Sequence, residues 1–250
     1  MTTTLKDFPK KTTAFLSKLS KNDNRKWFEA NRDSYNSDFL EPAVQFVVDM
    51  GDKLQDIDPD IVAIPKVDKS IFRLHRDVRF SKDKTPYKTN AGLYFWNGKM
   101  KKMDASGFYF HLEPKHFGVG LGIYMFSPQL LKKYRDVVSD SSSVKELHQV
   151  VRSLEKKGYT IGGKKYKKTP KGYDPDTLYP GYLLYEGIYA WFESSNLKLI
   201  SGGKAADSRG EFFGSAAGVG DGASAWDFQP APVRLAQGVS RRATWRHSRI

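Results

Sequence analysis

Six cationic side chains lie within residues 70–88, and only two acidic side chains balance them there. Guanidinium and ammonium groups bind phosphates and carboxylates, and a guanidinium does so through two parallel hydrogen bonds. Large apolar residues alternate with these cations, which favours partial burial over a fully solvated charge run. This stretch, called the basic segment below, therefore predicts an anion-binding site. Its expected ligand-binding residues are Arg73, Arg76, Arg79, Lys84, Tyr87 and Lys88.

The three arginines of the basic segment carry more charge than Asp77 and Asp83 neutralise. Burying an unpaired cation costs several kcal/mol, so a buried cluster needs further anions. Three interpretations stay open. The arginines form an ion-paired knot with acids from elsewhere, for which Glu29 and Glu113 are candidates, or they bind an anionic ligand, or they are exposed surface charge.

Three side chains are candidates for catalytic proton transfer: His111, Asp77 and Glu113. His111 and Glu113 are two residues apart in a stretch of alternating pattern, which places them on the same face of a strand. Glu113 would then orient His111 as a general base. A half-buried histidine with a satisfied hydrogen bond is the alternative, so the sequence leaves open whether the protein is an enzyme.

No pattern in the sequence indicates a metal or a cofactor. His75, His111 and Glu113 are the residues considered as metal ligands, but they lack a compact ligand spacing. The chain has no cysteine, and no serine stands in a nucleophile-elbow sequence. The sequence therefore predicts no metal and no cofactor.

The net charge of +13 points to anionic partners. Two windows, residues 60–104 and 156–171, carry the excess of lysine and arginine. The first expectation is a domain with a cationic site for a phosphorylated or other anionic small molecule. The second is a nucleic-acid-binding module in which Tyr87 or Trp96 stacks on bases, and the third is a structural ion-pair knot without a ligand. The oligomeric state is not indicated.

The expected secondary-structure elements that position these residues predict an α+β fold. Helical periodicity comes first, over residues 25–40 and about 42–57, and two further helices are expected after residues 127 and 143. Between them the pattern alternates, which predicts a mostly antiparallel sheet of about four to six strands within residues 61–125. The expected strands are residues 61–67, 70–76, 91–96, 107–113 and 117–124.

The last of these strands has an unusual composition. Gly118, Gly120 and Gly122 alternate with large apolar residues, so one face of the strand carries no side chains. A helix, a neighbouring side chain or a ligand must approach the backbone there.

The composition changes near the C-terminus. Residues 205–250 contain six arginines and no lysine, whereas residues 1–204 contain 28 lysines and seven arginines. The sequence therefore predicts a single domain over residues 10–195 and a tail of little structure over residues 196–250. Two explanations of the tail stay open: a gene-model or frameshift artefact, and a genuine flexible tail.

Targeting features are missing from the sequence. No apolar run reaches the roughly 18–20 residues that cross a bilayer, and the first residues have no apolar core of a secretory signal. Together with the absence of cysteine, this predicts an intracellular and cytoplasmic protein with no membrane partner, and leaves the nucleus open as a second compartment.

The basic segment closely resembles the signature of a widespread uncharacterised family, catalogued as domain of unknown function 2461. The matching residues are Arg73, Arg76-Asp77, Arg79-Phe80, Asp83-Lys84 and Tyr87. Residues 24–31, 107–114, 170–173 and 183–190 are similar to further segments of the family, so the resemblance covers about residues 10–190. The family continues with helical sequence where this chain has its tail. The resemblance implies family membership and no particular activity.

Overall fold

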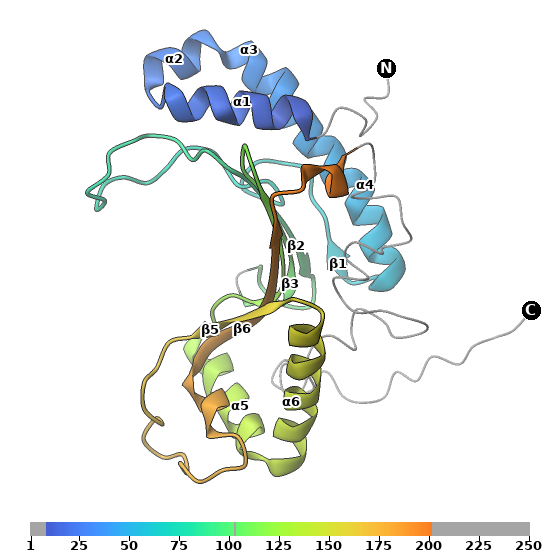
Figure 1. The fold of residues 1–250 in the computed structure, drawn as a ribbon, viewed down its shortest axis with the longest axis vertical. Coiled ribbons are helices and arrows are strands. Elements are labelled where there is room, and N and C mark those ends of the chain that lie inside the picture. Colours follow the sequence, from blue (N-terminus) through green and yellow to red (C-terminus); the bar gives the residue numbers. More distant parts are fainter. Residues whose placement is uncertain (1–8, 103, 202–250) are drawn as a thin grey trace, which may run out of the picture.

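The computed structural model describes residues 9–102 and 104–201 and confirms the expected α+β fold (Figure 1). One antiparallel sheet holds six strands in the order β1-β2-β3-β4-β6-β5. The strands are β1 (Ile61–Val62), β2 (Ala91–Asn97), β3 (Gly107–Leu112), β4 (Phe117–Ile123), β5 (Thr160–Lys164) and β6 (Tyr185–Ser194). The helical elements are α1 (Lys10–Lys21), α2 (Arg25–Ala30), α3 (Arg32–Ser34), η2 (Tyr35–Leu40), α4 (Glu41–Ile57), α5 (Pro128–Ser139), α6 (Ser141–Lys156), η3 (Pro180–Leu184) and η4 (Leu197–Ile200).

The N-terminal helices begin and end at other residues than expected. Asn24 caps α2 by accepting a hydrogen bond from the backbone N–H of Trp27. The helix expected over residues 25–40 is interrupted at Asn31, where the backbone leaves the helical region, and it continues as α3 and the π-helical η2. Pro42 lies in the first turn of α4, a position where proline is common.

The first two expected strands are largely wrong. Only Ile61–Val62 pairs as a strand, and residues 70–76 contribute isolated bridges such as Ile71 with Leu93. The chain turns between them, because Pro65 has no N–H to donate and Asp68 adopts a left-handed φ of 63°. The turn breaks the alternation that the apolar pattern alone predicts.

The sheet continues beyond residue 125, the limit that the sequence predicts. Strand β6 pairs with β4 along its length, with Gly120 opposite Trp191, and β5 pairs with β6 at the edge. Residues 182–192, whose aromatic run fits a helix or a strand, form the end of η3 and most of β6. Segments more than 60 residues apart in the sequence therefore lie side by side in the sheet.

Two apolar clusters pack on one face of the twisted sheet. The first joins α1, α2 and α4 to side chains of β1–β4 such as Phe110, which contacts Phe46 of α4. The second joins α5 and α6 to the other end of the sheet, through Ile123 and Ile188. In Figure 1 these two groups of helices lie at opposite ends of the sheet. Since successive side chains of a strand alternate, a second set points to the opposite face.

The C-terminal helices are close to the expected ones. Helix α5 starts at Pro128, whereas α6 starts at Ser141 with Asp140 as its cap, three residues before the expected cap at Ser143. The described chain continues past residue 195 into η4, where Ile200 is buried against the first apolar cluster. Residues 202–250 of the expected tail lie outside the described residues. Among the described helices, none combines the length and the apolar character needed to cross a membrane.

Candidate functional site

The basic segment forms a hairpin-like excursion from the edge of the sheet. Its two arms are held together by backbone hydrogen bonds, from Arg76 to Pro86 and from Lys88 to Leu74. Residues 70 and 72 run beside β2, where the Phe72 N–H donates to the carbonyl oxygen of Gly92 at 2.9 Å. The loop between the arms, residues 77–85, extends away from the sheet below α1 and α2 (Figure 1).

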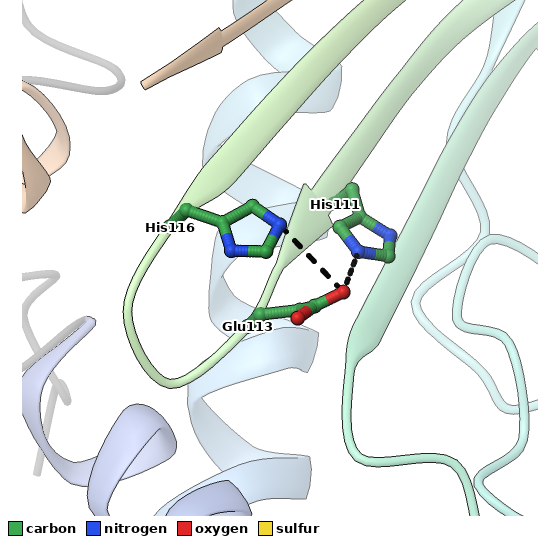
Figure 2. A group of neighbouring side chains, drawn as sticks. All are labelled: His111, Glu113 and His116. Atoms are coloured by element: carbon green, nitrogen blue, oxygen red, sulfur yellow. Dashed lines mark hydrogen bonds and ion pairs between the residues drawn. The ribbon is translucent and has the colours of Figure 1, made fainter. Parts of the chain in front are cut away.

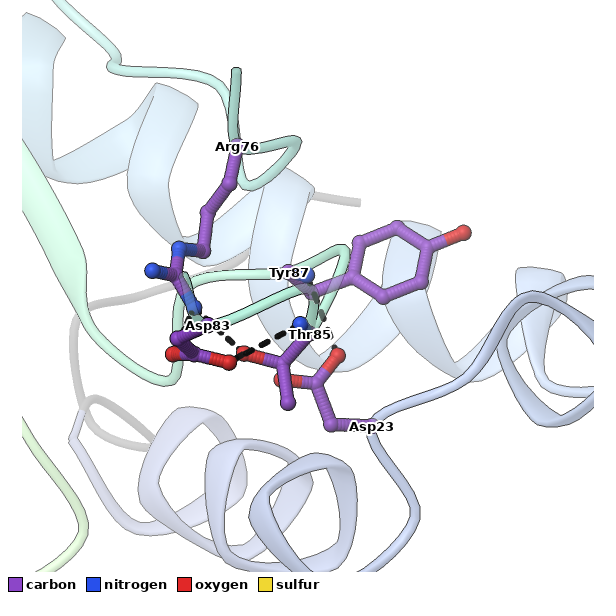
Figure 3. A network of polar contacts seen from close by, with 5 residues as sticks. All are labelled: Asp23, Arg76, Asp83, Thr85 and Tyr87. Carbon is purple, nitrogen blue, oxygen red and sulfur yellow. Dashed lines mark hydrogen bonds and ion pairs between the residues drawn. The ribbon is translucent and has the colours of Figure 1, made fainter. Parts of the chain in front are cut away.

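Arg76 is bound within the basic segment itself. Its guanidinium donates to Asp83 Oδ2 at 2.5 Å and to the hydroxyl of Thr85 (Figure 3). The N–H of Thr85, and after it the Arg76 guanidinium, hold the pKa of Asp83 at about 2. Nearby, Asp23 between α1 and α2 accepts a hydrogen bond from the backbone N–H of Tyr87 at 3.0 Å. The network ties this segment to the N-terminal helices.

The tip of the loop is a separate and exposed group. Arg79 forms a two-point pair with Asp77, with distances of 2.9 and 2.7 Å, and this pairing lowers the pKa of Asp77. The ammonium of Lys84 donates to the carbonyl oxygen of Val78 at 3.0 Å. Phe80 is 95% exposed, although its alternation with the cations predicts burial. Arg76 and Arg79 thus face different carboxylates instead of one shared anion site.

Tyr87 is placed differently from its expected ligand-stacking role. Only 2% of the residue is exposed, and its ring stacks on Phe28 with centroids 4.2 Å apart. The ring belongs to the first apolar cluster, beside His75. Aromatic residues of a folded hairpin arm are drawn into the nearest core, so Tyr87 holds this arm against α2. Buried in this way, the Tyr87 ring has no open face for the ligand stacking that the sequence predicts.

The remaining cations of the segment lie beside a cavity of about 670 Å³ on the sheet face opposite the two apolar clusters. Lys88 lines this cavity, and Arg73 lies close enough that it adds to the effect of burial in lowering the pKa of Lys88. Arg73 itself is exposed and faces Asp68 at 4.0 Å. We call this space the sheet cavity. Its aromatic lining residues are Phe72, Tyr94, Tyr109, Tyr124, Tyr189 and Trp191.

Glycines form the floor of the sheet cavity, and Trp191 of β6 explains part of the glycine stripe. A β-carbon at Gly118 would lie 2.1 Å from Cζ2 of Trp191, and one at Gly120 would lie 3.1 Å from Cε3 of the same ring. At Gly122 a φ of 134° and the nearby carbonyl oxygen of Ile188 exclude a side chain. A neighbouring side chain therefore covers the first glycine, and the cavity opens over Gly120 and Gly122.

Two ammonium groups supply the charge of the sheet cavity. Lys102 and Lys88 both line it, and burial lowers the pKa of each. The ammonium of Lys102 lies 4.8 Å from the centroid of the Phe72 ring and donates to the carbonyl oxygen of Lys69. Asp68 is the acid that opposes these shifts in both lysines. Burial also raises the pKa of the Tyr109 hydroxyl to about 12, so this group is neutral at pH 7.

The three candidates for proton transfer lie in two separate parts of the structure. His111 Nε2 lies 2.9 Å from Glu113 Oε1, as the strand spacing predicts, and His116 lies on the other side of the same carboxylate (Figure 2). Asp77 is bound to Arg79 in the exposed loop instead. His75, considered as a metal ligand with His111 and Glu113, instead packs against the rings of Phe28 and Tyr87. Among the described residues, His111, Glu113 and His116 have donor atoms close enough to share a metal ion.

Several residues of this region gave no signal in the sequence. Lys102 and Trp191 reach the cavity from outside residues 70–88, Lys102 from the connection between β2 and β3 and Trp191 from β6. The Glu29 and Glu113 carboxylates, expected to pair with the arginines of the basic segment, bind elsewhere: Glu29 faces Arg32, and Glu113 faces the two histidines. The one weak sequence signal for this cavity is that Lys102 closely follows a strand rich in aromatic residues.

Comparisons with known proteins identify the family. A search of curated proteins found no match, and neither did a search of solved structures. A family model described as "Conserved hypothetical protein (DUF2461)" matches residues 11–217, which include the basic segment and all six strands. Since this match spans most of the 250 residues, the chain belongs to the DUF2461 family.

Proposed function

We propose that the sheet cavity binds a small organic anion with a flat apolar body. The observation that carries this proposal is the position of Lys88 and Lys102 in a cavity whose other walls are mainly aromatic. Aromatic faces take up flat apolar groups, and partly desolvated ammonium groups bind an anion more strongly than exposed ones do. The volume of about 670 Å³ is within the range of small-molecule sites.

The charge balance supports an anion over a cation. Lys88, Lys102 and the adjacent Arg73 outnumber Asp68 at this end of the cavity. The lowered pKa of each ammonium means that part of its hydration has been lost, and a phosphate or carboxylate would restore those hydrogen bonds. The anion site proposed here keeps Lys88 from the expected residues and adds Lys102, whereas Arg76 and Arg79 are paired with carboxylates.

The first prediction concerns the two lysines. Naphthyl phosphate is expected to bind more tightly than neutral naphthol in calorimetric titrations of the full chain. Lys88→Gln and Lys102→Gln should each lower the affinity for naphthyl phosphate by about 10- to 100-fold, which corresponds to the loss of one charged hydrogen bond. Naphthol should be affected little, since it lacks the charge.

Lys145→Gln is the matched control, because it removes one charge from an exposed position on α6 outside the cavity. Equal affinity for the two naphthyl compounds, or unchanged affinity in both cavity variants, would exclude an anion site here. Absence of any naphthyl phosphate binding would count equally against it.

A second candidate function rests on the loop tip. Phe80 is almost fully exposed, and Arg79, Lys82 and Lys84 surround it in sequence. Exposed aromatic rings beside cations bind single-stranded nucleic acids by stacking and by phosphate contacts. We propose this role for the tip as the alternative to a purely structural loop.

The second prediction tests that role by fluorescence anisotropy with a single-stranded oligonucleotide. Binding should fall steeply between about 50 and 200 mM salt. Phe80→Ala should weaken it by roughly 5- to 150-fold, as expected for the loss of one stacked base at about 1–3 kcal/mol. Leu178→Ala, at another exposed apolar position, serves as the control. If the protein retains no oligonucleotide at low salt, this candidate is removed.

A further inference from the structure

The turn between β3 and β4 gathers two imidazoles and a carboxylate. His111 lies on β3, Glu113 follows the end of that strand, and His116 precedes β4. The backbone N–H of Glu113 donates to the carbonyl oxygen of His116 at 2.8 Å, which closes the turn. Figure 2 shows the three side chains directed toward one another from the two strand ends. Regular backbone pairing therefore sets their separation.

The distances within this group suit a shared ion. Glu113 Oε1 lies 2.9 Å from His111 Nε2 and 3.7 Å from His116 Nε2, and one donor atom from each residue lies within 4.8 Å of the others. Two ligand atoms bound tetrahedrally to zinc at about 2.0–2.2 Å lie ~3.3–3.6 Å apart. The two contacts with Glu113 bracket this separation. We propose that His111, Glu113 and His116, called the His–Glu–His group, bind a divalent transition-metal ion.

The donor set selects the class of metal. Magnesium and calcium are bound mainly by oxygen ligands, whereas imidazole nitrogen suits zinc and the neighbouring divalent ions of the first transition row. Two histidines with one carboxylate are a ligand set that zinc enzymes use, with a water molecule completing the coordination. The side chains of Glu113 and His116 are 37% and 39% exposed, so an ion and a water molecule can reach them.

The surroundings of His111 support a metal at its Nε2. Its Nδ1 lies 3.4 Å from the Tyr109 hydroxyl and 3.3 Å from the amide of Asn90. A metal on Nε2 requires the proton on Nδ1. This N–H can donate a hydrogen bond to the hydroxyl oxygen of Tyr109, or to the amide oxygen of Asn90 once that amide is flipped. Outer hydrogen bonds of this kind orient histidine ligands in known metal sites. Tyr109 and Asn90 also line the sheet cavity.

A hydrogen-bonded cluster without a metal makes a different prediction about the proton. In that case the Asn90 amide donates to His111 Nδ1, and His111 Nε2–H donates to Glu113. Metal binding would move the proton of His111 from Nε2 to Nδ1. The tautomer of His111 therefore distinguishes the two cases independently of any effect on stability.

The test is a zinc titration of the metal-free full chain, followed by calorimetry and by nitrogen-15 NMR of the histidine rings. We expect one equivalent of zinc to bind and the His111 signal to change to the Nδ1–H tautomer. Glu113→Gln, which keeps the shape of the side chain, and His116→Ala should each weaken zinc binding roughly 100-fold. Magnesium should not compete with zinc.

His148→Gln is the matched control. His148 lies on α6, is hydrogen-bonded to Tyr182, and does not belong to the His–Glu–His group. Thermal melts of the apo variants check that the substitutions at these half-buried positions leave the fold intact. Zinc affinity that is the same in His116→Ala, Glu113→Gln and the parent protein would overturn the proposal, and so would an unchanged His111 tautomer at saturating zinc. No organic anion is present in this titration, so its outcome is independent of the proposed cavity function.

Discussion

Replacing Tyr87 with alanine is expected to lower the free energy of unfolding by about 3–5 kcal/mol, the usual cost of deleting a buried aromatic ring. Tyr87 is 2% exposed and stacks on Phe28, so the deleted ring would leave a void between the basic segment and α2. Phe80→Ala, at the exposed tip of the same segment, should change stability by less than about 0.5 kcal/mol. Urea unfolding followed by circular dichroism measures both.

Tyr87→Phe separates a structural role from a ligand-binding one. The Tyr87 hydroxyl is buried and has no hydrogen-bond partner among the residues that the structure describes. Removing a buried unpaired hydroxyl is expected to leave stability unchanged or to raise it by about 1 kcal/mol. A loss of more than about 1 kcal/mol in Tyr87→Phe would mean that the hydroxyl has a partner within the protein and a structural role of its own, whereas a gain would mark an unsatisfied group that a ligand could pair with.

The fold was predictable where local pattern and pairing agree. Strands β3 and β4 alternate clearly, and Pro128 marks the start of α5, so their types follow from the sequence. Residues 70–76 alternate equally well but form no strand, because the turn at Pro65 and Asp68 allows only part of the segment to pair with β2. Periodicity reports which face a residue prefers, and it does not report whether a partner strand is available.

The candidate site was predictable only in part, because its residues meet through long-range pairing. The basic segment pointed to Lys88, which lines the sheet cavity, but the same reasoning placed Arg76 and Arg79 in one cluster, whereas each pairs with its own carboxylate. Asp77 and Asp83, the two acids of the segment, pair with Arg79 and Arg76, but the sequence alone does not reveal that each pair forms separately. His116 and Trp191 depend on a turn closure and on the β4–β6 register, which no single-sequence pattern specifies.

The second large effect is expected at the contact between Gly118 and Trp191. Gly118→Ala should lower the free energy of unfolding by about 1–3 kcal/mol, since its β-carbon would lie 2.1 Å from the indole and the ring would have to move. In a Trp191→Ala background the same substitution should be neutral or stabilising by about 0.5–1 kcal/mol, because alanine is favoured over glycine within a regular element once the space is free. The predicted coupling energy is therefore about 1–4 kcal/mol.

Gly158→Ala is the control for this cycle, because Gly158 has a φ of 87° and no atom within 4 Å of the position that a β-carbon would take. Its cost, about 1 kcal/mol from backbone strain, should be the same with and without Trp191. Additive effects of Gly118→Ala and Trp191→Ala would show that the ring does not rest on Gly118. Gly118→Ala also tests the cavity, because Trp191 lines it. An indole displaced by this substitution should lower the affinity for naphthyl phosphate and for naphthol alike. Loss of Lys102 should affect the phosphate alone, and this contrast separates the shape of the cavity from its charge.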